Sequence, residues 1–278
     1  MALDRPHLQL ARASHLALVL ALMSGCPSPG PGTRAQGAEP APPEAPGRTE
    51  PPAPTEVPGI AIAPLAENVW LHTSYHELPG IGPFPSHGLL VKAGGTLYLI
   101  DTAWSETQTR ELLALAEKQL SMRVEVAVVT HAHGDKMGGM GALHAAGVIT
   151  HAHPLSNRDA PTRDLQPARH DLALVDASVR FADGAIEVFY PGPGHTRDNI
   201  VVYLPQVGVL HGGCLIRPGA SRSLGNTADA DIGHWDTAAL ALAARYPEVQ
   251  VVVPSHGPPG GPELLQHTAT LVERHRSR

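Results

Sequence analysis

The sequence predicts an α/β (α+β) fold with two mixed sheets and helices on their outer faces. Three observations favour this class. Residues 124–130 are apolar except for Glu125 and Thr130, and such a run is typical of a buried strand. Before that run, Leu112, Ala116 and Leu120 recur with the period of a helix. Strand patterns and helix patterns are then interspersed to the end of the chain, as they are when helices cover sheets.

Each element follows from a local pattern. Short apolar runs predict the first strands at 60–62, 69–71, 88–92 and 96–100. The last two are expected to form a hairpin about Gly94 and Gly95. Ser105 is the predicted N-cap of the helix that follows, and Gly147 is expected to end a helix over 140–146. Later strands are predicted at 148–150, 178–181, 186–190, 199–204, 207–211 and 249–253, and helices around 235–245 and 262–274.

The N-terminal residues are typical of an export signal and a linker. Arg5 and Arg12 precede an apolar run over 16–23 that is too short to span a bilayer. The run leads into Cys26 through a sequence similar to a bacterial lipoprotein cleavage box, although an ordinary signal peptide with an incidental Cys26 stays open. We therefore expect a periplasmic protein, anchored to the outer membrane by a lipid on Cys26. The predicted parts are a lipoprotein-type signal peptide at 1–25, a Pro-rich disordered tether at 26–57 and one domain at 58–278.

Composition narrows the possible functions. The formal net charge of −6 provides no overall basic field, so we expect no nucleic-acid partner. Two cysteines cannot build a disulfide framework. The 17 histidines raise the question of metal binding, because histidine is the commonest metal ligand.

The strongest local signal is the sequence His131-Ala132-His133-Gly134-Asp135, which follows the buried strand at 124–130. Two histidines separated by one residue project toward the same side of an extended segment, so both imidazoles reach one metal ion. Asp135 adds an oxygen ligand placed to reach a second ion. The alternative is a solvated polar loop after a strand.

Three later residues add to this signal, and each lies in a loop at the end of a predicted strand. They are His195, Cys214 and His256. A single cysteine in an exported chain is a liability in an oxidising compartment unless a metal holds its thiolate. With Cys26 lipidated, Cys214 has no disulfide partner, which favours a metal ligand over an inert buried thiol.

These residues, in this order, resemble the zinc ligands of the metallo-β-lactamases, in particular the first subclass and its New Delhi type. Further similarity lies in 130–140, 190–196 and 223–226, and the resemblance runs from about Leu65 to the C-terminus. It implies the four-layer αβ/βα metallo-β-lactamase sandwich, with the site in a groove at the edge of the two sheets. Lys136 and Cys214 stand where other hydrolases of the superfamily usually carry His and Asp, which argues against lactone, thioester or phosphodiester substrates.

The resemblance implies a dizinc β-lactam hydrolase that acts as a monomer. One Zn²⁺ would be held by His131, His133 and His195, and the other by Asp135, Cys214 and His256. Zinc-bound hydroxide would open the amide of penicillins, cephalosporins and carbapenems, which confers antibiotic resistance. Asp135 would orient the attacking water, and Asn226 would donate a hydrogen bond to the lactam oxygen. A non-catalytic exported zinc-binding protein is the remaining alternative.

The resemblance also implies a set of substrate contacts. Arg217 occupies the position of the usual carboxylate-binding lysine, with Arg222 close by in the sequence, and either could instead be a surface charge. Residues 75–87 resemble a mobile hairpin that closes over the substrate with apolar side chains. Its apolar side chains are Leu78, Ile81 and Phe84. Trp104 would form an apolar wall, or else belong to the core.

Other polar residues near these motifs need separate interpretation. His151 and His153 repeat the two-histidine spacing, but no carboxylate follows them, so we do not expect them to be ligands. Lys136 either supports Asp135 or lies on the surface. His76 and His87 flank the expected lid and are possible substrate contacts.

Overall fold

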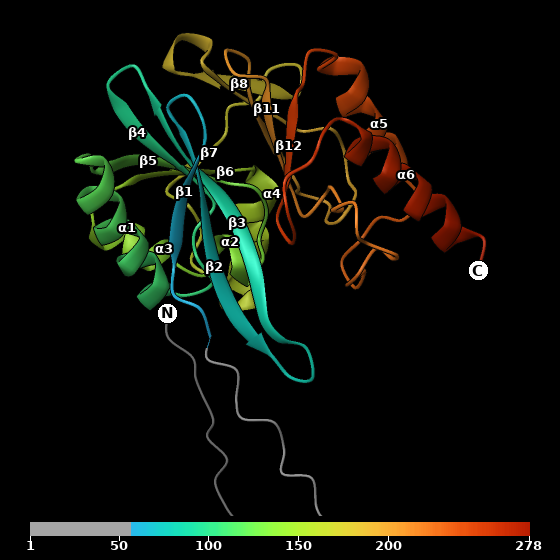
Figure 1. Cartoon of the computed structure of the whole chain (residues 1–278), viewed down its shortest axis with the longest axis horizontal. Coiled ribbons are helices and arrows are strands. Elements are labelled where there is room, and N and C mark those ends of the chain that lie inside the picture. Colours follow the sequence, from blue (N-terminus) through green and yellow to red (C-terminus); the bar gives the residue numbers. More distant parts are fainter. Residues whose placement is uncertain (1–56) are drawn as a thin grey trace, which may run out of the picture. The chain divides into compact units, whose positions relative to one another are not determined.

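Two sheets pack face to face in the part of the chain described by a computed structural model, residues 57–278 (Figure 1). The predicted signal peptide, Cys26 and all of the tether before residue 57 lie outside the described residues. Within 57–278, no helix is both long enough and apolar enough to span a bilayer.

The first sheet has seven strands in chain order, β1 to β7. Pairing is antiparallel from β1 to β4 and parallel from β4 to β7. The strands are β1 (Ala61–Ala66), β2 (Val69–Leu78), β3 (Gly82–Ala93), β4 (Thr96–Ile100), β5 (Val124–Val129), β6 (Ile149–Ala152) and β7 (His170–Asp171). Because β4, β5 and β6 are parallel, the loops that follow them emerge at one edge of this sheet.

The second sheet has five strands in the order β12-β11-β10-β9-β8, with β11 and β12 parallel. They are β8 (Ser178–Phe181), β9 (Ile186–Phe189), β10 (Val201–Leu204), β11 (Val209–Gly213) and β12 (Val251–Pro254). The helices are α1 (Glu106–Leu120), α2 (Gly134–Met137), α3 (Met140–Ala145), α4 (Pro154–Asp159), α5 (Trp235–Arg245) and α6 (Glu263–Arg276). Two 3₁₀ turns, η1 (Ala160–Arg163) and η2 (Ala182–Gly184), complete the fold.

Three buried apolar clusters separate four layers. One lies between α1, α3 and the seven-stranded sheet, one between the two sheets, and one between the five-stranded sheet and α5 and α6. Strand β4 shows how the sequence builds this, because Leu97 and Leu99 face the helices while Tyr98 and Ile100 face the other sheet. Figure 1 shows α1 and α3 on one outer side and α5 and α6 on the other. The predicted sandwich with outer helices is confirmed.

Local signals set several element ends as predicted. Ser105 caps α1, and its hydroxyl accepts a hydrogen bond from the Gln108 backbone N–H at 3.2 Å. Gly147 follows α3 with a φ of 76°, a conformation that glycine adopts without strain. The short helix α4 and the two-residue strand β7 had no predicted counterpart, because both depend on packing more than on a periodic pattern.

The hairpin expected over 75–87 is present. Strands β2 and β3 pair continuously as far as Leu78 and Gly82, so this segment is a β-ribbon that ends in a short turn. The arm formed by β2 and β3 extends beyond the sheet in Figure 1, and Pro83 and Pro85 pair within β3. Ile81 lies at the turn with 69% of its surface exposed.

Replacing Gly88 with alanine is expected to destabilise the fold. A β-carbon there would overlap the His72 ring and the Ile100 carbonyl oxygen, both of which are buried and hydrogen-bonded to each other. Overpacking of this kind costs about 1–3 kcal/mol. Urea unfolding should show the loss, and Gly59→Ala, which has open space around it, should change stability by less than about 0.5 kcal/mol. Equal urea midpoints of unfolding for Gly88→Ala and Gly59→Ala would contradict this packing.

Candidate metal centre and substrate groove

The loop after β5 carries the two-histidine motif at the edge where the sheets meet. Asp198 holds this loop in place, since its Oδ2 accepts hydrogen bonds from the Ala132 backbone N–H at 2.9 Å and from the Ser156 hydroxyl at 2.7 Å. The backbone N–H of Ile200, just before β10, also donates to the carbonyl of Thr130, just after β5, at 2.9 Å. This hydrogen bond links the two sheets. The motif is therefore fixed from both sheets.

Three histidine nitrogens converge above this edge. His133 Nδ1 lies 3.1 Å from His131 Nε2 and 3.3 Å from His195 Nε2. Three imidazole nitrogens bound tetrahedrally to one zinc ion at 2.0–2.1 Å lie about 3.3 Å apart. The spacing of these nitrogens therefore fits one Zn²⁺.

A second group of three ligand types lies beside the first. Cys214 follows β11 and His256 follows β12, so the parallel pairing of these strands brings them together. Cys214 Sγ lies 3.5 Å from Asp135 Oδ2 and 3.3 Å from His256 Nε2, and these last two atoms are 3.5 Å apart. The spacing again fits a tetrahedral zinc ion with one thiolate, one carboxylate and one imidazole. All six predicted ligands are thus brought together.

Burial and charge prepare these ligands for a cation. Burial lowers the pKa of His131 well below its ordinary value, with His133 and His195 adding to the effect, so its imidazole is neutral and free to bind metal. Burial would raise the pKa of Asp135, but Lys136 and the nearby histidines lower it further than burial raises it. Asp135 is therefore an ionised ligand.

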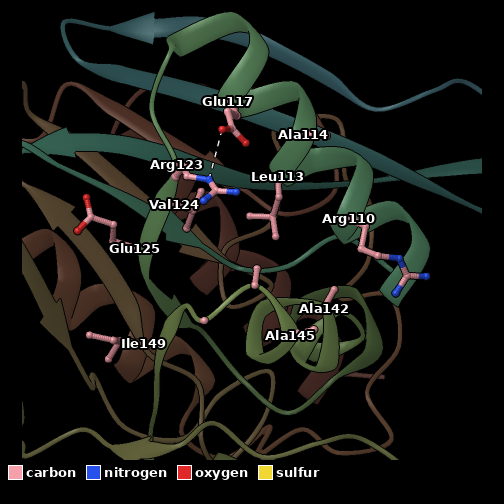
Figure 2. Close-up of a pocket in the computed structure, with 12 residues that line it drawn as sticks. Arg110, Leu113, Ala114, Glu117, Arg123, Val124, Glu125, Ala142, Ala145 and Ile149 are labelled. Atoms are coloured by element: carbon pink, nitrogen blue, oxygen red, sulfur yellow. Dashed lines mark ion pairs between the residues drawn. The ribbon is translucent and has the colours of Figure 1, made fainter.

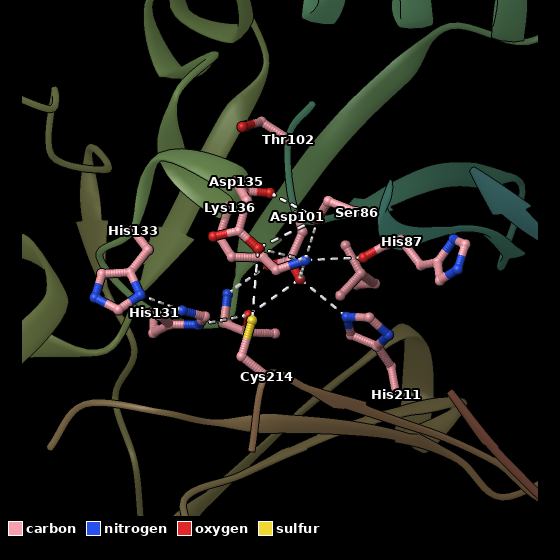
Figure 3. A network of polar contacts seen from close by, with 12 residues as sticks. Ser86, His87, Asp101, Thr102, His131, His133, Asp135, Lys136, His211 and Cys214 are labelled. Carbon is pink, nitrogen blue, oxygen red and sulfur yellow. Dashed lines mark hydrogen bonds and ion pairs between the residues drawn. The ribbon is translucent and has the colours of Figure 1, made fainter. Parts of the chain in front are cut away.

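Lys136 is completely buried. Figure 3 shows it in a network of polar contacts with Asp101, Asp135 and Ser86. The Lys136 ammonium group donates to the Ser86 hydroxyl at 2.8 Å and to the His87 carbonyl at 2.9 Å. It also pairs with Asp135 Oδ2 at 3.3 Å and Asp101 Oδ2 at 3.5 Å. Burial would lower the pKa of Lys136, but the two carboxylates raise it, so the side chain is charged. The structure excludes the surface interpretation of Lys136.

Asp101 joins this ammonium group to both sheets. It follows β4, and its carboxylate accepts hydrogen bonds from the backbone N–H of Thr130 at 2.7 Å and the hydroxyl of Thr130 at 3.0 Å. His211 of β11 lies 2.9 Å away through its Nε2. Asp101 has a φ of 65°, an uncommon backbone conformation for a non-glycine residue, which these contacts hold in place.

A second carboxylate orients His133 from the other side. Asp229 Oδ2 accepts a hydrogen bond from His133 Nε2 at 2.9 Å, which leaves Nδ1 of that ring unprotonated toward His131 and His195. Arg163 donates to the same oxygen at 2.7 Å. The hydrogen bond to His133 lowers the pKa of Asp229 despite burial, and Arg163 adds to the effect. Neither Asp229 nor Arg163 was predicted, because their distance in sequence from the ligands hides the contact.

A groove of about 510 Å³ covers both ligand groups. The predicted Leu78, Phe84 and Trp104 form an apolar wall, and Trp104 stacks on His76 with ring centroids 5.2 Å apart. Arg163, Leu165, Asn226 and Asp229 also line the groove. The partly buried Trp104 is thus a wall of the groove and not part of the core.

Arg217 and Ile81, two other predicted substrate contacts, are not among the residues that line the groove. Arg217 is half-buried beside Gly225, and its Nη2 is 3.5 Å from the Ser221 hydroxyl. Burial and, to a smaller extent, the charge of Arg217 lower the pKa of His256, so Arg217 lies near the Asp-Cys-His group. Arg222 is exposed. His87 is buried with Nδ1 2.9 Å from the Thr73 hydroxyl, so it is no substrate contact.

The second two-histidine motif has a structural role. His153 is the N-cap of α4, and its Nδ1 accepts a hydrogen bond from the Leu155 backbone N–H at 3.1 Å. His151 packs on Phe181 with ring centroids 5.2 Å apart. Within residues 57–278, neither belongs to a group of three metal-binding side chains.

A larger cavity of about 610 Å³ lies between α1 and α3 (Figure 2). Leu113 and Ala142 are among its lining residues, and Arg123 pairs with Glu117 at 3.3 Å beside it. It shares no lining residue with the groove and contains none of the six ligands. The chemistry-bearing residues therefore belong to the smaller groove.

Comparison with known proteins decides the family. Residues 81–256 match the model of the metallo-beta-lactamase superfamily. The chain belongs to this superfamily. The metallo-beta-lactamase type 2 of Bacillus cereus is 39% identical over 214 residues, which are 77% of this chain and 83% of that relative. The matching protein of Bacteroides fragilis is 34% identical over 217 residues, 78% of this chain and 86% of that relative.

Solved structures agree with this assignment of the chain to the metallo-β-lactamases. The mono-zinc form of the metallo-beta-lactamase FIM-1 from Pseudomonas aeruginosa is 46% identical, covers 80% of this chain and 99% of its own, and superposes with a TM-score of 0.77. A metallo-beta-lactamase from Erythrobacter litoralis is 43% identical with a TM-score of 0.75, covering 79% and 99% of the two chains.

Proposed function

We propose that this metallo-β-lactamase hydrolyses the amide bond of β-lactams in a zinc-dependent reaction, with penicillins, cephalosporins and carbapenems as substrates. The observation that carries the proposal is the pair of adjoining ligand groups at one groove, each with zinc-like spacing. The names of the relatives support the same activity.

The donor sets favour two Zn²⁺ ions. His131, His133 and His195 would hold one ion, since His133 Nδ1 lies 3.1 Å from His131 Nε2 and 3.3 Å from His195 Nε2. Asp135, Cys214 and His256 would hold the other. A cysteine sulfur, a carboxylate oxygen and an imidazole nitrogen at this spacing form a donor set typical of Zn²⁺, which supports occupancy of the second group. When bound, zinc supplies Lewis acidity and a water molecule acidic enough to act as a nucleophile near neutral pH.

The protein's own residues would position the reacting groups. Ionised Asp135 accepts a hydrogen bond from the attacking water and so orients it. Asn226 Oδ1 accepts a hydrogen bond from the Ala228 backbone N–H at 3.0 Å, which leaves its Nδ2 free to donate to the lactam oxygen. A well-placed donor of this kind lowers the barrier by about 3 kcal/mol as the oxygen gains negative charge.

The apolar wall of Leu78, Phe84 and Trp104 would pack on the substrate and exclude water from it. Phe84 also packs on His256, with ring centroids 4.7 Å apart, so the ribbon that carries it reaches the ligand group directly. Substrate binding and the position of the β2–β3 ribbon are therefore expected to be coupled.

Export completes the proposal. The apolar run over 16–23 and Cys26 support a periplasmic lipoprotein anchored to the outer membrane, where it would meet β-lactams before they reach their targets. We propose that it acts as a monomer. Only the lipid on Cys26 would contact the membrane.

The deciding test is hydrolysis of one penicillin, one cephalosporin and one carbapenem by purified protein of known zinc content. We expect turnover of all three classes, its loss after dialysis against a chelator, and its return when Zn²⁺ is added. Zinc per chain, measured by mass spectrometry, should approach two. Protein that binds zinc but turns over none of the three would refute the proposed function.

A further inference from the structure

Arg163 provides a positive charge at the three-histidine end of the groove. It is the last residue of η1, its side chain is 27% exposed, and it lines the groove next to Asp229. Among the described residues that line the groove, it is the one arginine or lysine, since Lys136 is buried and, like Arg217, lies outside the lining. The groove therefore contains one cationic side chain.

The contacts of Arg163 leave half of its guanidinium available. Nη1 donates to Asp229 Oδ2 at 2.7 Å, and within residues 57–278 neither Nε nor Nη2 has a hydrogen-bond acceptor. Those two groups form the edge of a guanidinium that binds a carboxylate with two parallel hydrogen bonds. Asp229 thus fixes the side chain without using its carboxylate-binding edge.

The position of Arg163 indicates which part of a substrate it meets. Through Asp229 it is linked to His133, and it makes no hydrogen bond or ion pair with Asp135, Cys214 or His256. For a β-lactam whose carbonyl carbon is placed at the three histidines and whose ring nitrogen points to the Asp-Cys-His group, the acylamino side chain is on the far side of the carbonyl. That side chain then extends toward Arg163.

We infer that Arg163 binds an acidic group on the acylamino side chain, so that the enzyme favours β-lactams with a second carboxylate there. This inference rests on the proposed function. Leu165 beside Arg163 gives that end of the groove an apolar surface for the rest of the side chain. Arg163 is a specificity-determining residue in this arrangement.

The test compares carbenicillin with benzylpenicillin, which differ by one carboxylate on the side chain. Replacing Arg163 with methionine should lower the ratio of kcat/KM for carbenicillin to kcat/KM for benzylpenicillin about tenfold. A loss of this size is expected when a charge-assisted hydrogen bond is removed from a partly exposed site. The loss should appear mainly in KM for carbenicillin, and Arg163→Lys should retain part of the preference. Inhibition by hydrolysed carbenicillin should weaken in parallel, which measures binding without turnover.

The control is Arg158→Met, which removes the same charge from an exposed side chain five positions earlier that does not line the groove. It should leave the ratio unchanged. An unchanged ratio in Arg163→Met, or an equal loss for both substrates together with lost zinc, would overturn the inference. Failure of the wild-type enzyme to hydrolyse either penicillin would instead refute the proposed function.

Discussion

Replacing Lys136 with methionine is expected to destabilise the protein by about 3–5 kcal/mol, because it leaves the buried carboxylates of Asp101 and Asp135 without their cation. It should also weaken zinc binding by the Asp-Cys-His group about 10–100-fold, since Lys136 holds the Asp135 ligand in place. Urea unfolding of the metal-free protein measures the first effect. Competition with a chromophoric chelator measures the second.

Two variants separate charge from general damage at this position. Lys92→Met makes the same substitution on an exposed side chain and should leave both stability and zinc affinity unchanged. Lys136→Arg retains the charge and should bind the second zinc more tightly than Lys136→Met does. Its larger head group is expected to lower the free energy of unfolding relative to the wild type. If Lys136→Met bound the second zinc as tightly as the wild type, the proposed support of Asp135 would be wrong.

Replacing Cys214 with serine is expected to remove the second zinc ion and to leave the first. A serine hydroxyl stays protonated near neutral pH and binds zinc poorly, whereas a thiolate is a strong ligand. Zinc content should fall from two ions per chain to one. Activity should fall by more than the 10–100-fold typical of residues that only support a ligand. Because serine is close to cysteine in size, the folded structure should persist.

Cobalt substitution gives an independent measurement of this ligand. Wild-type protein loaded with Co²⁺ should show a thiolate-to-cobalt charge-transfer band, and Cys214→Ser should lack it. Cys26→Ser in the full chain, the same substitution at the other cysteine, should retain the band and both ions. Equal zinc content and equal turnover in Cys214→Ser would exclude Cys214 from the ligand set.

The candidate metal ligands could be predicted because they occur in short sequence patterns. His131, His133 and Asp135 lie within five residues, and Cys214 and His256 each follow an apolar strand. Parallel strands place their following loops at one sheet edge, so strand-end residues meet without any need to know the packing in detail. The cap at Ser105 and the end of α3 at Gly147 were equally local.

The contacts that support the ligands could not be predicted in the same way. The hairpin over 75–87 was expected, but the unbroken pairing of Pro83 and Pro85 within β3 is seen only in the structure. From the sequence, Lys136 could equally be a support for Asp135 or a surface residue. Its burial depends on Asp101 and Ser86, which are 35 and 50 positions away in the chain.

The sequence by itself determined the layered α/β fold and indicated the six candidate ligands, since helix and strand periods and residue chemistry act over a few positions. The tertiary structure decided which charges serve the site. In the folded protein Lys136 is buried beside Asp135, and Arg217 is outside the groove lining. Asp229 contacts His133 and is itself bound by Arg163. A charge acts through space and not along the chain, so its role appears only when the elements that carry it are packed together.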